Sequence, residues 1–314
     1  MRVAANRDGA GIETRRPKLK SRMATIFECV PNISEGRRAD VVDAIGKIAV
    51  DGADVVLVDT QTDAAHNRSV YTLIGSGEGV LEAAVRIAGA AVERIDLRTH
   101  KGEHPRMGAV DVIPFIPLGD ASMDEAIRLA RSCAQELWRR FGLPSYFYGL
   151  AATRPERRRL PDVRKGEFEG LLEGVKQPAR HPDVGEPALH PSAGIVAVGA
   201  RDFLIAFNIN LATSDVNVAE RIAAGLRASS GGLAGIQAKG FAIADNVVQV
   251  SMNITDFRGA ALYRVIELVR REAGASGAAI RNCELVGLAP LAAIADSAAY
   301  YLRLASIDPA QITW

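Results

Sequence analysis

The sequence reads His100-Lys101-Gly102-Glu103-His104-Pro105-Arg106-Met107-Gly108 and continues, after Ala109, into Val110-Asp111-Val112-Ile113-Pro114-Phe115-Ile116. Two glycines and a proline in nine residues exclude a long regular element, so we predict a polar loop that leads into a buried strand. Loops on a rigid scaffold often present catalytic side chains. The five histidines, at positions 66, 100, 104, 181 and 190, all lie in turn-like segments. Because histidine titrates near neutral pH, this distribution favours a working site over core filling.

Around this loop, the periodicity of apolar residues predicts two similar halves. The first half has predicted strands at 26–30, 55–60, 69–74, 110–116 and 145–148, and predicted helices at 37–50, 79–94, 123–141 and 167–175. The second half has predicted strands at 203–210, 235–243, 247–254 and 279–285, and predicted helices at 217–229, 259–274 and 290–304. The two halves therefore share the order β-α-β-β-α-β-α, spaced by about 180 residues.

This order predicts an α/β fold of the α+β sandwich kind. We expect two similar ferredoxin-like βαββαβ-type subdomains, each a mixed β-sheet with helices packed on one face, and a ligand crevice between them. The expected parts are a disordered N-terminal extension at 1–24, an N-terminal subdomain at 25–202 with an irregular linker at 153–202, and a C-terminal subdomain at 203–314. The halves differ at the polar loop, where only the first takes some fifteen residues between helix and strand. Such an elaboration of one copy indicates function.

Composition excludes several classes of protein. The first 22 residues hold seven Lys/Arg and two Asp/Glu, which leaves 31 basic and 35 acidic residues in the rest. That balance gives no electrostatic case for nucleic acid or membrane binding. The opening segment has no signal-peptide core, and Met23 could be the true start. No apolar run is long enough for a spanning helix, and three scattered cysteines without a secretion signal indicate a cytoplasmic protein.

The polar loop contains the first candidate site. Pro105 keeps His104 extended, Glu103 or Asp96 could orient the imidazole, and Arg106 could hold an anion. The alternative is a surface loop with scattered charges. Zinc is not expected, because glycine and proline break the helix that would align the two loop histidines, and no HExxH pattern is present. Neither a P-loop nor a GxGxxG motif follows a strand.

Three further segments are candidates, each with a simpler alternative. The segment Asp59–Arg68 joins two strands, and its Asn67 and Arg68 could bind a carboxylate unless it is only a long hairpin loop. The segment Cys29–Gly36 could receive an anion at a helix start, or could be a plain cap, with Cys29 a buried hydrophobe. The segment His181–Gly194 could cover a flat ligand, or could be a linker.

Together these motifs resemble the glutamate formimidoyltransferase family, which includes the transferase part of formiminotransferase-cyclodeaminase. The resemblance runs from about Thr25 to Leu304. Its landmarks are Glu28-Cys29-Val30-Pro31-Asn32-Ile33-Ser34-Glu35-Gly36, Asn67-Arg68-Ser69-Val70-Tyr71-Thr72, the string His100–Gly108, Tyr146-Phe147-Tyr148-Gly149, Phe203–Leu211 and Glu284-Leu285-Val286-Gly287-Leu288. The string His100–Gly108 is highly specific.

The resemblance implies a transferase of one-carbon groups in histidine degradation. Such an enzyme moves the formimidoyl group of N-formimidoyl-L-glutamate to N5 of tetrahydrofolate, a co-substrate, without a metal. It implies that His104 is the catalytic general acid and base, and that the enzyme is a homodimer. The folate-contacting stretch falls on Gly185, Glu186, Pro187, Ala188, Leu189, His190, Pro191, Ser192, Ala193 and Gly194.

Supporting roles are expected for Asp59, Asp63, Asn67, Arg68, His100, Lys101 and Arg106. Of these, Arg68, Lys101 or Arg106 would hold the donor carboxylates, and His100 would be a hydrogen-bond partner in the loop. The sequence departs from the mammalian-type pattern at Gln61, where an acidic residue is usual and Asp63 could replace it. Two alternatives stay open: the same fold with 5-formyltetrahydrofolate or N-formylglutamate as formyl donor, and a non-catalytic folate-binding module.

Overall fold

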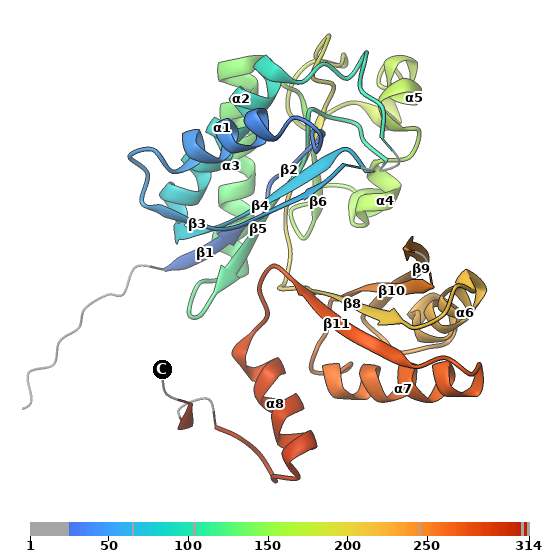
Figure 1. The fold of residues 1–314 in the computed structure, drawn as a ribbon. Coiled ribbons are helices and arrows are strands. Elements are labelled where there is room, and N and C mark those ends of the chain that lie inside the picture. The colour runs from blue at the N-terminus through green and yellow to red at the C-terminus, as the bar shows by residue number, and fades with distance from the viewer. Residues whose placement is uncertain (1–24, 65, 103–104, 245, 309–310, 313–314) are drawn as a thin grey trace, which may run out of the picture.

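The computed structural model describes residues 25–64, 66–102, 105–244, 246–308 and 311–312 of the 314-residue chain. The chain forms two α/β halves, one after the other, with the second lying below the first in Figure 1. The expected extension at 1–24 lies outside the described residues.

The first half is built on a seven-stranded sheet in the order β3-β4-β1/β2-β5-β7-β6. Its strands are β1 (Ile26–Cys29), β2 (Asn32–Ile33), β3 (Val55–Asp63), β4 (Arg68–Ser76), β5 (Val110–Leu118), β6 (Ser145–Gly149) and β7 (Val196–Ala200). Pairing is antiparallel from β3 to β5, and β7 then pairs in parallel with both β5 and β6. The expected mixed sheet is confirmed in this half.

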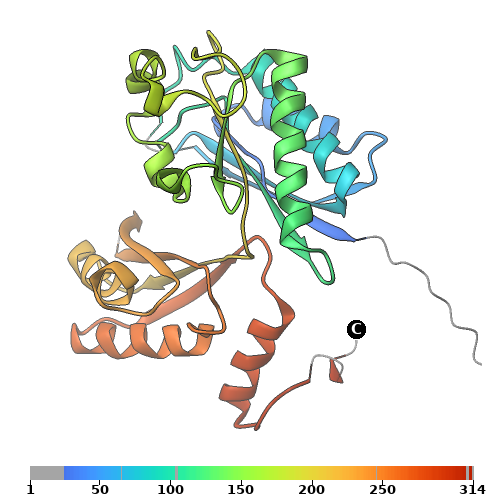
Figure 2. The same ribbon diagram turned by 180° about the vertical axis from the view of Figure 1, so that it is seen from behind.

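Three helices cover one face of this sheet: α1 (Ala39–Val50), α2 (Gly77–Arg94) and α3 (Met123–Phe141). Figure 2, viewed from behind, shows α3 lying along that face. The start of α3 is fixed by a capping box between Ser122 and Glu125, and Gly142 ends it at φ 61°. The other face carries short segments around η1 (Pro155–Arg157), α4 (Leu160–Val163), α5 (Glu167–Gly174) and η2 (Pro178–Arg180).

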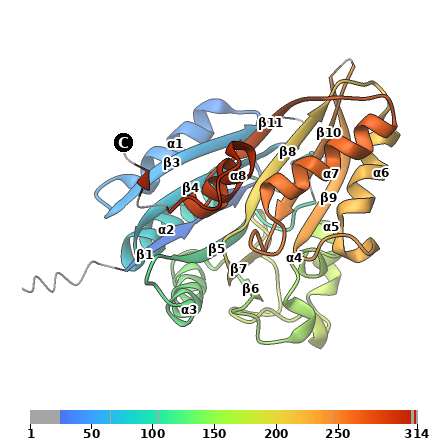
Figure 3. The same cartoon turned by 90° about the horizontal axis from the view of Figure 1, so that it is seen from below.

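The second half is a four-stranded sheet in the order β11-β8-β10-β9, and its pairings are all antiparallel in the described part of the chain. Its elements are β8 (Ile205–Leu211), α6 (Val216–Leu226), η3 (Ala228–Ser230), β9 (Ile236–Ala244), β10 (Val247–Ile254), α7 (Leu262–Ala275), β11 (Ile280–Val286) and α8 (Leu291–Leu302). Helix α7 lies on the side of this sheet that faces away from the first half (Figures 1 and 3).

The predicted repeat is present. Strands β5, β1, β4 and β3 of the first half have the same order and connections as β11, β8, β10 and β9 of the second. This is the ferredoxin-like βαββαβ arrangement. The first half adds β6 and β7 beyond β5, which makes its sheet mixed, whereas the second sheet is purely antiparallel rather than mixed.

The connection between the second helix and the next strand is longer in the first half than in the second, as predicted. In the first half, α2 ends at Arg94 and β5 begins at Val110, whereas α7 ends at Ala275 and β11 already begins at Ile280. The two sheets have separate cores on their helix-covered faces. In the part of the chain that the structure describes, no helix has the length and apolar character needed to span a bilayer.

Candidate active site

The polar loop His100–Gly108, called the histidine loop from here on, is anchored on both sides of residues 103 and 104. Glu103 and His104 lie outside the described residues, so the structure locates their neighbours. On one side, Gly102 packs so closely on the backbone of His66 and on Asn67 that a Cβ atom at this position would collide with both. On the other side, the Arg106 carbonyl accepts a hydrogen bond from the Phe168 amide of α5, at 2.9 Å. The loop is therefore anchored between the β3–β4 turn and α5.

Asn67 links three segments that the sequence predicted separately. It has a left-handed backbone, with φ 49°, and its side chain is buried. Its Oδ1 accepts a hydrogen bond from the Gly36 amide, and its Nδ2 donates to the Lys101 carbonyl, both at 2.9 Å. The predicted anion-binding turn, the β3–β4 connection and the histidine loop therefore meet at this amide.

The two aspartates of the β3–β4 segment make local contacts. Asp63 accepts a hydrogen bond from the His66 amide at 2.9 Å, and its carboxylate lies 2.7 Å from His66 Nδ1. Asp59 accepts a hydrogen bond from Gln61 Nε2, also at 2.9 Å. Asp63 therefore closes the turn beside Asn67, whereas Gln61 lines the pocket described below.

His100 and Arg106 form a pair inside the loop. The His100 Nε2 atom lies 3.1 Å from the Asn67 carbonyl, and Arg106 Nε donates to His100 Nδ1 at 3.3 Å. An acceptor at one ring nitrogen and a donor at the other fit a neutral imidazole with its proton on Nε2. Burial and the Arg106 cation both lower the pKa of His100, which favours the same neutral form. Both ring nitrogens of His100 are therefore used in hydrogen bonds within the protein.

Arg106 itself is bound within the chain rather than turned to a ligand. Its guanidinium makes two short hydrogen bonds to Glu169 and contacts Glu167 at 3.4 Å. The predicted role of Arg106 in holding donor carboxylates does not fit this arrangement, because these hydrogen bonds already occupy the donors that a substrate would use. The sequence could not show this, because Glu169 lies 63 residues further along the chain.

A pocket of about 370 Å³ lies beside the loop, between the face of the first sheet opposite α1, α2 and α3 and one end of the second sheet. It is lined from the first half by Glu28, Val30, Asn32, Gln61, Arg68, Val70, Thr72, Val112, Pro114, Tyr148, Leu160, Arg164 and Arg201, and from the second by Leu204, Ala206, Asn253, Val286, Gly287 and Leu288. The predicted crevice between the halves therefore exists, and its lining includes three arginines and one carboxyl group.

Arg68 lies at the loop end of this pocket, next to Asn67. Its Nη2 donates to Asn32 Oδ1, and its buried Nε has no hydrogen-bond partner among the described residues. Burial, together with the nearby Arg164 cation, lowers the pKa of Arg68 to about 10. Two neighbouring guanidinium groups with an unpartnered N–H form a site that attracts an anion.

Arg164 was not among the predicted site residues, and it lies in the stretch at 153–202 that was expected to be an irregular linker. It forms an ion pair with Asp111, a carboxylate that is only 2% exposed, and its buried Nε has no hydrogen-bond partner in the described chain. The second oxygen of Asp111 accepts a hydrogen bond from the Met107 amide at 2.9 Å. Asp111, near the start of β5, therefore connects Met107 of the histidine loop to Arg164 of the pocket.

The segment 185–194 packs against the other side of the histidine loop. The Ala109 amide donates to the Ala193 carbonyl and the Leu97 amide to the Ser192 carbonyl, both at 2.8 Å. His190 Nδ1 accepts from the Ala193 amide at 3.0 Å, and burial lowers the pKa of this histidine. Residues 185–188 are exposed. The histidine loop and the segment 185–194, which the family resemblance marks as catalytic and folate-contacting, therefore lie next to each other.

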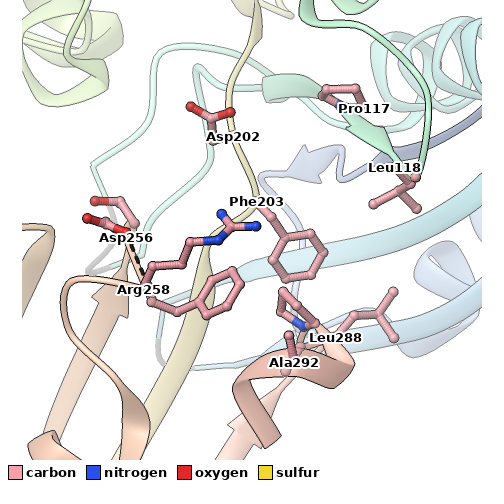
Figure 4. Close-up of a pocket in the computed structure, with 13 residues that line it drawn as sticks. Pro117, Leu118, Asp202, Phe203, Asp256, Arg258, Leu288 and Ala292 are labelled. Carbon is pink, nitrogen blue, oxygen red and sulfur yellow. Dashed lines mark hydrogen bonds between the residues drawn. The ribbon is translucent and has the colours of Figure 1, made fainter. Parts of the chain in front are cut away.

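A second cavity, of about 710 Å³, lies at the junction of the halves (Figure 4). Phe203, Leu288 and Arg258 project toward it from three different segments. Leu288 also lines the first pocket, and Asp202 and Phe203 lie in the sequence between the first-pocket residues Arg201 and Leu204. The segment that joins the halves thus separates two adjacent cavities.

Within the described residues, potential metal ligands are scattered, and the two cysteines of the first half are buried. Within the described ranges, no three His, Cys, Asp or Glu side chains gather as a metal site would require. Cys29 and Cys133 are fully buried in the first core, and burial raises the pKa of both thiols. Cys29 is therefore a core residue rather than a nucleophile.

Comparison with known proteins matches both halves to one family. The model of the formiminotransferase domain, N-terminal subdomain, matches residues 26–201, and the model of the formiminotransferase domain matches residues 206–308.

Three relatives illustrate the similarity. The chain is 43% identical over 287 residues to a glutamate formimidoyltransferase from Streptococcus pyogenes serotype M1, covering 91% of the chain and 96% of the relative. It is 43% identical over 291 residues to a glutamate formimidoyltransferase from Thermoplasma acidophilum, covering 92% and 96%. It is 44% identical over 286 residues to the formimidoyltransferase-cyclodeaminase of Rattus norvegicus, covering 89% of the chain and 53% of that longer relative.

Proposed function

The chain belongs to the formiminotransferase family, and we propose that it transfers the formimidoyl group of N-formimidoyl-L-glutamate to N5 of tetrahydrofolate, with His104 as general acid and base. The observation that carries this function is the identity of 43% to glutamate formimidoyltransferases over 91% of the chain. Like these relatives, it is a transferase of one-carbon groups. The products are 5-formimidoyltetrahydrofolate and L-glutamate.

In this reaction His104 moves one proton between two nitrogens. Its neutral imidazole removes the proton of tetrahydrofolate N5 as this nitrogen attacks the amidine carbon. The resulting tetrahedral intermediate collapses when the imidazolium protonates the departing nitrogen of glutamate. General acid–base assistance of this kind contributes a factor of roughly 10² to 10⁴ in rate. The hydrogen bonds of Asn67 and Arg106 support this role, because they fix the chain on both sides of the catalytic residue.

The donor carboxylates are placed at Arg68 and Arg164. Both guanidinium groups line the pocket beside the loop, and each has a buried Nε without a partner among the described residues. Arg supplies a planar pair of donors that matches a carboxylate. Lys101 is exposed in the histidine loop and is a second candidate for the same role. Arg106 is no longer a candidate, because its guanidinium is paired with Glu169.

Tetrahydrofolate is placed between the pocket and the segment 185–194, which the family resemblance marks as the folate-contacting stretch. The contact between this segment and the histidine loop supports that placement, because the folate must reach the catalytic residue. No step of the proposed reaction requires a metal.

The direct test is an assay of the purified full chain with tetrahydrofolate and N-formimidoyl-L-glutamate, in which 5-formimidoyltetrahydrofolate and released glutamate are both measured. Parallel reactions replace the donor by N-formyl-L-glutamate, or supply 5-formyltetrahydrofolate with glutamate. We expect turnover with the formimidoyl donor to exceed the others by at least about 100-fold, a selectivity that differences of a few kcal/mol provide. Faster turnover of a formyl donor would contradict the proposal, and tight folate binding without any transfer would instead identify a binding module.

The assembly proposed from the family is a homodimer, and the compartment is the cytoplasm. Helix α8 exposes several large apolar side chains, as a subunit contact would require: Leu291, Ile294, Tyr300, Tyr301 and Leu302. The sparse, unpaired cysteines suit a reducing compartment. Light scattering coupled to gel filtration gives the mass of the assembly, and a monomeric mass at micromolar concentration would contradict the dimer.

A further inference from the structure

Glu28 is a buried carboxyl in the wall of the first pocket. Along β1, Phe27 and Cys29 pack into the core beneath α1, α2 and α3, so the side chain between them points to the opposite face of the sheet. There it lines the pocket while remaining only 4% exposed. Its neighbours in the register are Ile74 on β4 and Ile116 on β5, which offer no polar group.

This carboxyl has no internal partner. None of the described residues donates a hydrogen bond to its side chain or forms an ion pair with it within 4.0 Å. Its oxygens are not among the fully enclosed unpartnered atoms of the described residues, so they open to the pocket. Arg201 lines the same pocket, but its Nη1 donates to the Asp202 carbonyl at 3.0 Å. Burial dominates over this cation and raises the pKa of Glu28 to about 7. A buried carboxyl without a partner is costly, and a hydrophobic residue of similar size would be more stable here.

Glu28 also lies away from Arg68 and its neighbour Arg164, at the other end of the pocket. Arg68 contacts Asn32, which follows Glu28 by four residues along β1 and β2, a distance of roughly 13 Å at the rise of a strand. The histidine loop is at the Arg68 end, because Asn67 binds Lys101 there. A ligand group bound at Glu28 is therefore remote both from the proposed site of the donor carboxylates and from the described part of the histidine loop.

We propose that Glu28 binds the pyrimidine edge of the tetrahydrofolate pterin, accepting hydrogen bonds from its N3–H and 2-amino groups. Two parallel N–H donors match a carboxylate in the same way as a guanidinium does. The formimidoyl amidinium presents the same chemistry, but its carbon must lie beside His104 to react. Position along the pocket therefore favours the pterin. This assignment rests on the proposed function and adds the residue that orients the folate.

The test compares Glu28→Gln, which keeps the shape of the side chain, with Glu93→Gln, which makes the same charge change at an exposed position of α2 on the far face of the sheet. The dissociation constant of 5-formyltetrahydrofolate is measured without donor, so the result is independent of group transfer. We expect the Glu28 variant to bind roughly 10- to 100-fold more weakly and the Glu93 variant to bind like the original chain. The Michaelis constant for N-formimidoyl-L-glutamate should change less than about twofold.

A ligand analogue provides a second arm that needs no variant. A 2-desamino-2-methyl analogue of the same folate lacks one of the two donors, and it should bind the original chain at least tenfold more weakly than the parent, but Glu28→Gln with little discrimination. Equal affinity of the original chain for both folates would overturn the proposal. So would a variant whose folate affinity is unchanged while the Michaelis constant of the donor rises, which would assign Glu28 to the amidinium. Absence of transfer in the original chain, with these binding differences intact, would contradict the proposed function alone.

Discussion

Arg106 and Glu169 are joined by two hydrogen bonds, Nη2 to Oε1 at 2.6 Å and Nη1 to Oε2 at 2.8 Å. This bidentate pair ties the end of the histidine loop to α5, where the Phe168 amide also donates to the Arg106 carbonyl. Charged pairs of this geometry are among the stronger hydrogen bonds in proteins. We therefore expect Arg106 to position the loop that carries His104 rather than to bind the donor.

A double-mutant cycle tests this role. Arg106→Gln and Glu169→Gln should each lower kcat, because each releases the same anchor, and the double variant should be little worse than either alone. We expect a coupling energy in urea unfolding of about 0.5–3 kcal/mol. The Michaelis constant for the donor should stay within about threefold. A large rise of that constant in the Arg106 variant alone would instead assign Arg106 to substrate.

Substitution of Arg68, unlike that of Arg106, is expected to weaken donor binding and to leave the stability of the chain almost unchanged. Arg68→Gln removes one of two close cations, and burial with Arg164 already lowers the pKa of Arg68. The free energy of unfolding should therefore change by less than about 1 kcal/mol, while the Michaelis constant for N-formimidoyl-L-glutamate should rise roughly 10- to 100-fold. Arg98→Gln, at an exposed arginine paired with Asp96, is the matched control. An unchanged Michaelis constant in Arg68→Gln would refute carboxylate binding.

Much of the fold could be predicted because its periodicities are regular. The helix at Met123–Phe141 and the strand at Val247–Ile254 were predicted with the bounds that the structure has. Strand β7, at Val196–Ala200, was missed and treated as part of an irregular linker. It pairs in parallel on both sides and is completely buried, so its five residues show no alternation of polar and apolar positions.

Only those parts of the site that lie within short continuous segments could be predicted from the sequence. The composition of His100–Gly108 was enough to identify this loop as a candidate, and Asn67 was predicted to have a supporting role. Its hydrogen bonds to Gly36 and Lys101 are visible only in the structure. Arg106 is paired with Glu169 of α5, and Asp111 with Arg164, which follows α4. Both partners are more than fifty residues away along the chain, and no local pattern connects them. Glu28 stood in a family landmark without a role, because its lack of an internal partner is visible only in three dimensions.

Asn67 should be essential for holding the loop. Asn67→Ala loses the hydrogen bonds to Gly36 and Lys101 and puts alanine at φ 49°, so we expect a loss of roughly 2–4 kcal/mol in the free energy of unfolding. Asn246→Ala, at an exposed turn with φ 59°, makes the same backbone change far from these contacts and should cost about 1 kcal/mol. Denaturant unfolding measures both. Equal losses would show that the loop contacts contribute nothing.

His104→Ala should lower kcat by roughly 10² to 10⁴ while the affinity for 5-formyltetrahydrofolate is retained. His181→Ala is the matched control, because that ring contacts the Lys176 carbonyl in the segment between the halves. Added imidazole should restore part of the lost rate, as it can replace the missing base. A variant within tenfold of the original rate would exclude His104 as the catalyst.

The stability of the ligand-free chain should depend on pH through Glu28. Its pKa in the folded chain is about 7, compared with 4.5 for an ordinary glutamate, so between these values the folded state holds a proton that the unfolded state has lost. The contribution is fully present below pH 4.5 and is lost as the pH rises through 7, by an amount on the order of 3 kcal/mol. Glu28→Gln cannot ionise, so it should match the original chain near pH 4.5 and become more stable than it by about that amount at pH 8. Urea unfolding of both proteins across this range gives the difference curve, in which other titrating groups cancel. A flat difference would mean that the Glu28 carboxyl ionises in the folded chain as it does in water, and that a ligand is not needed to compensate its burial.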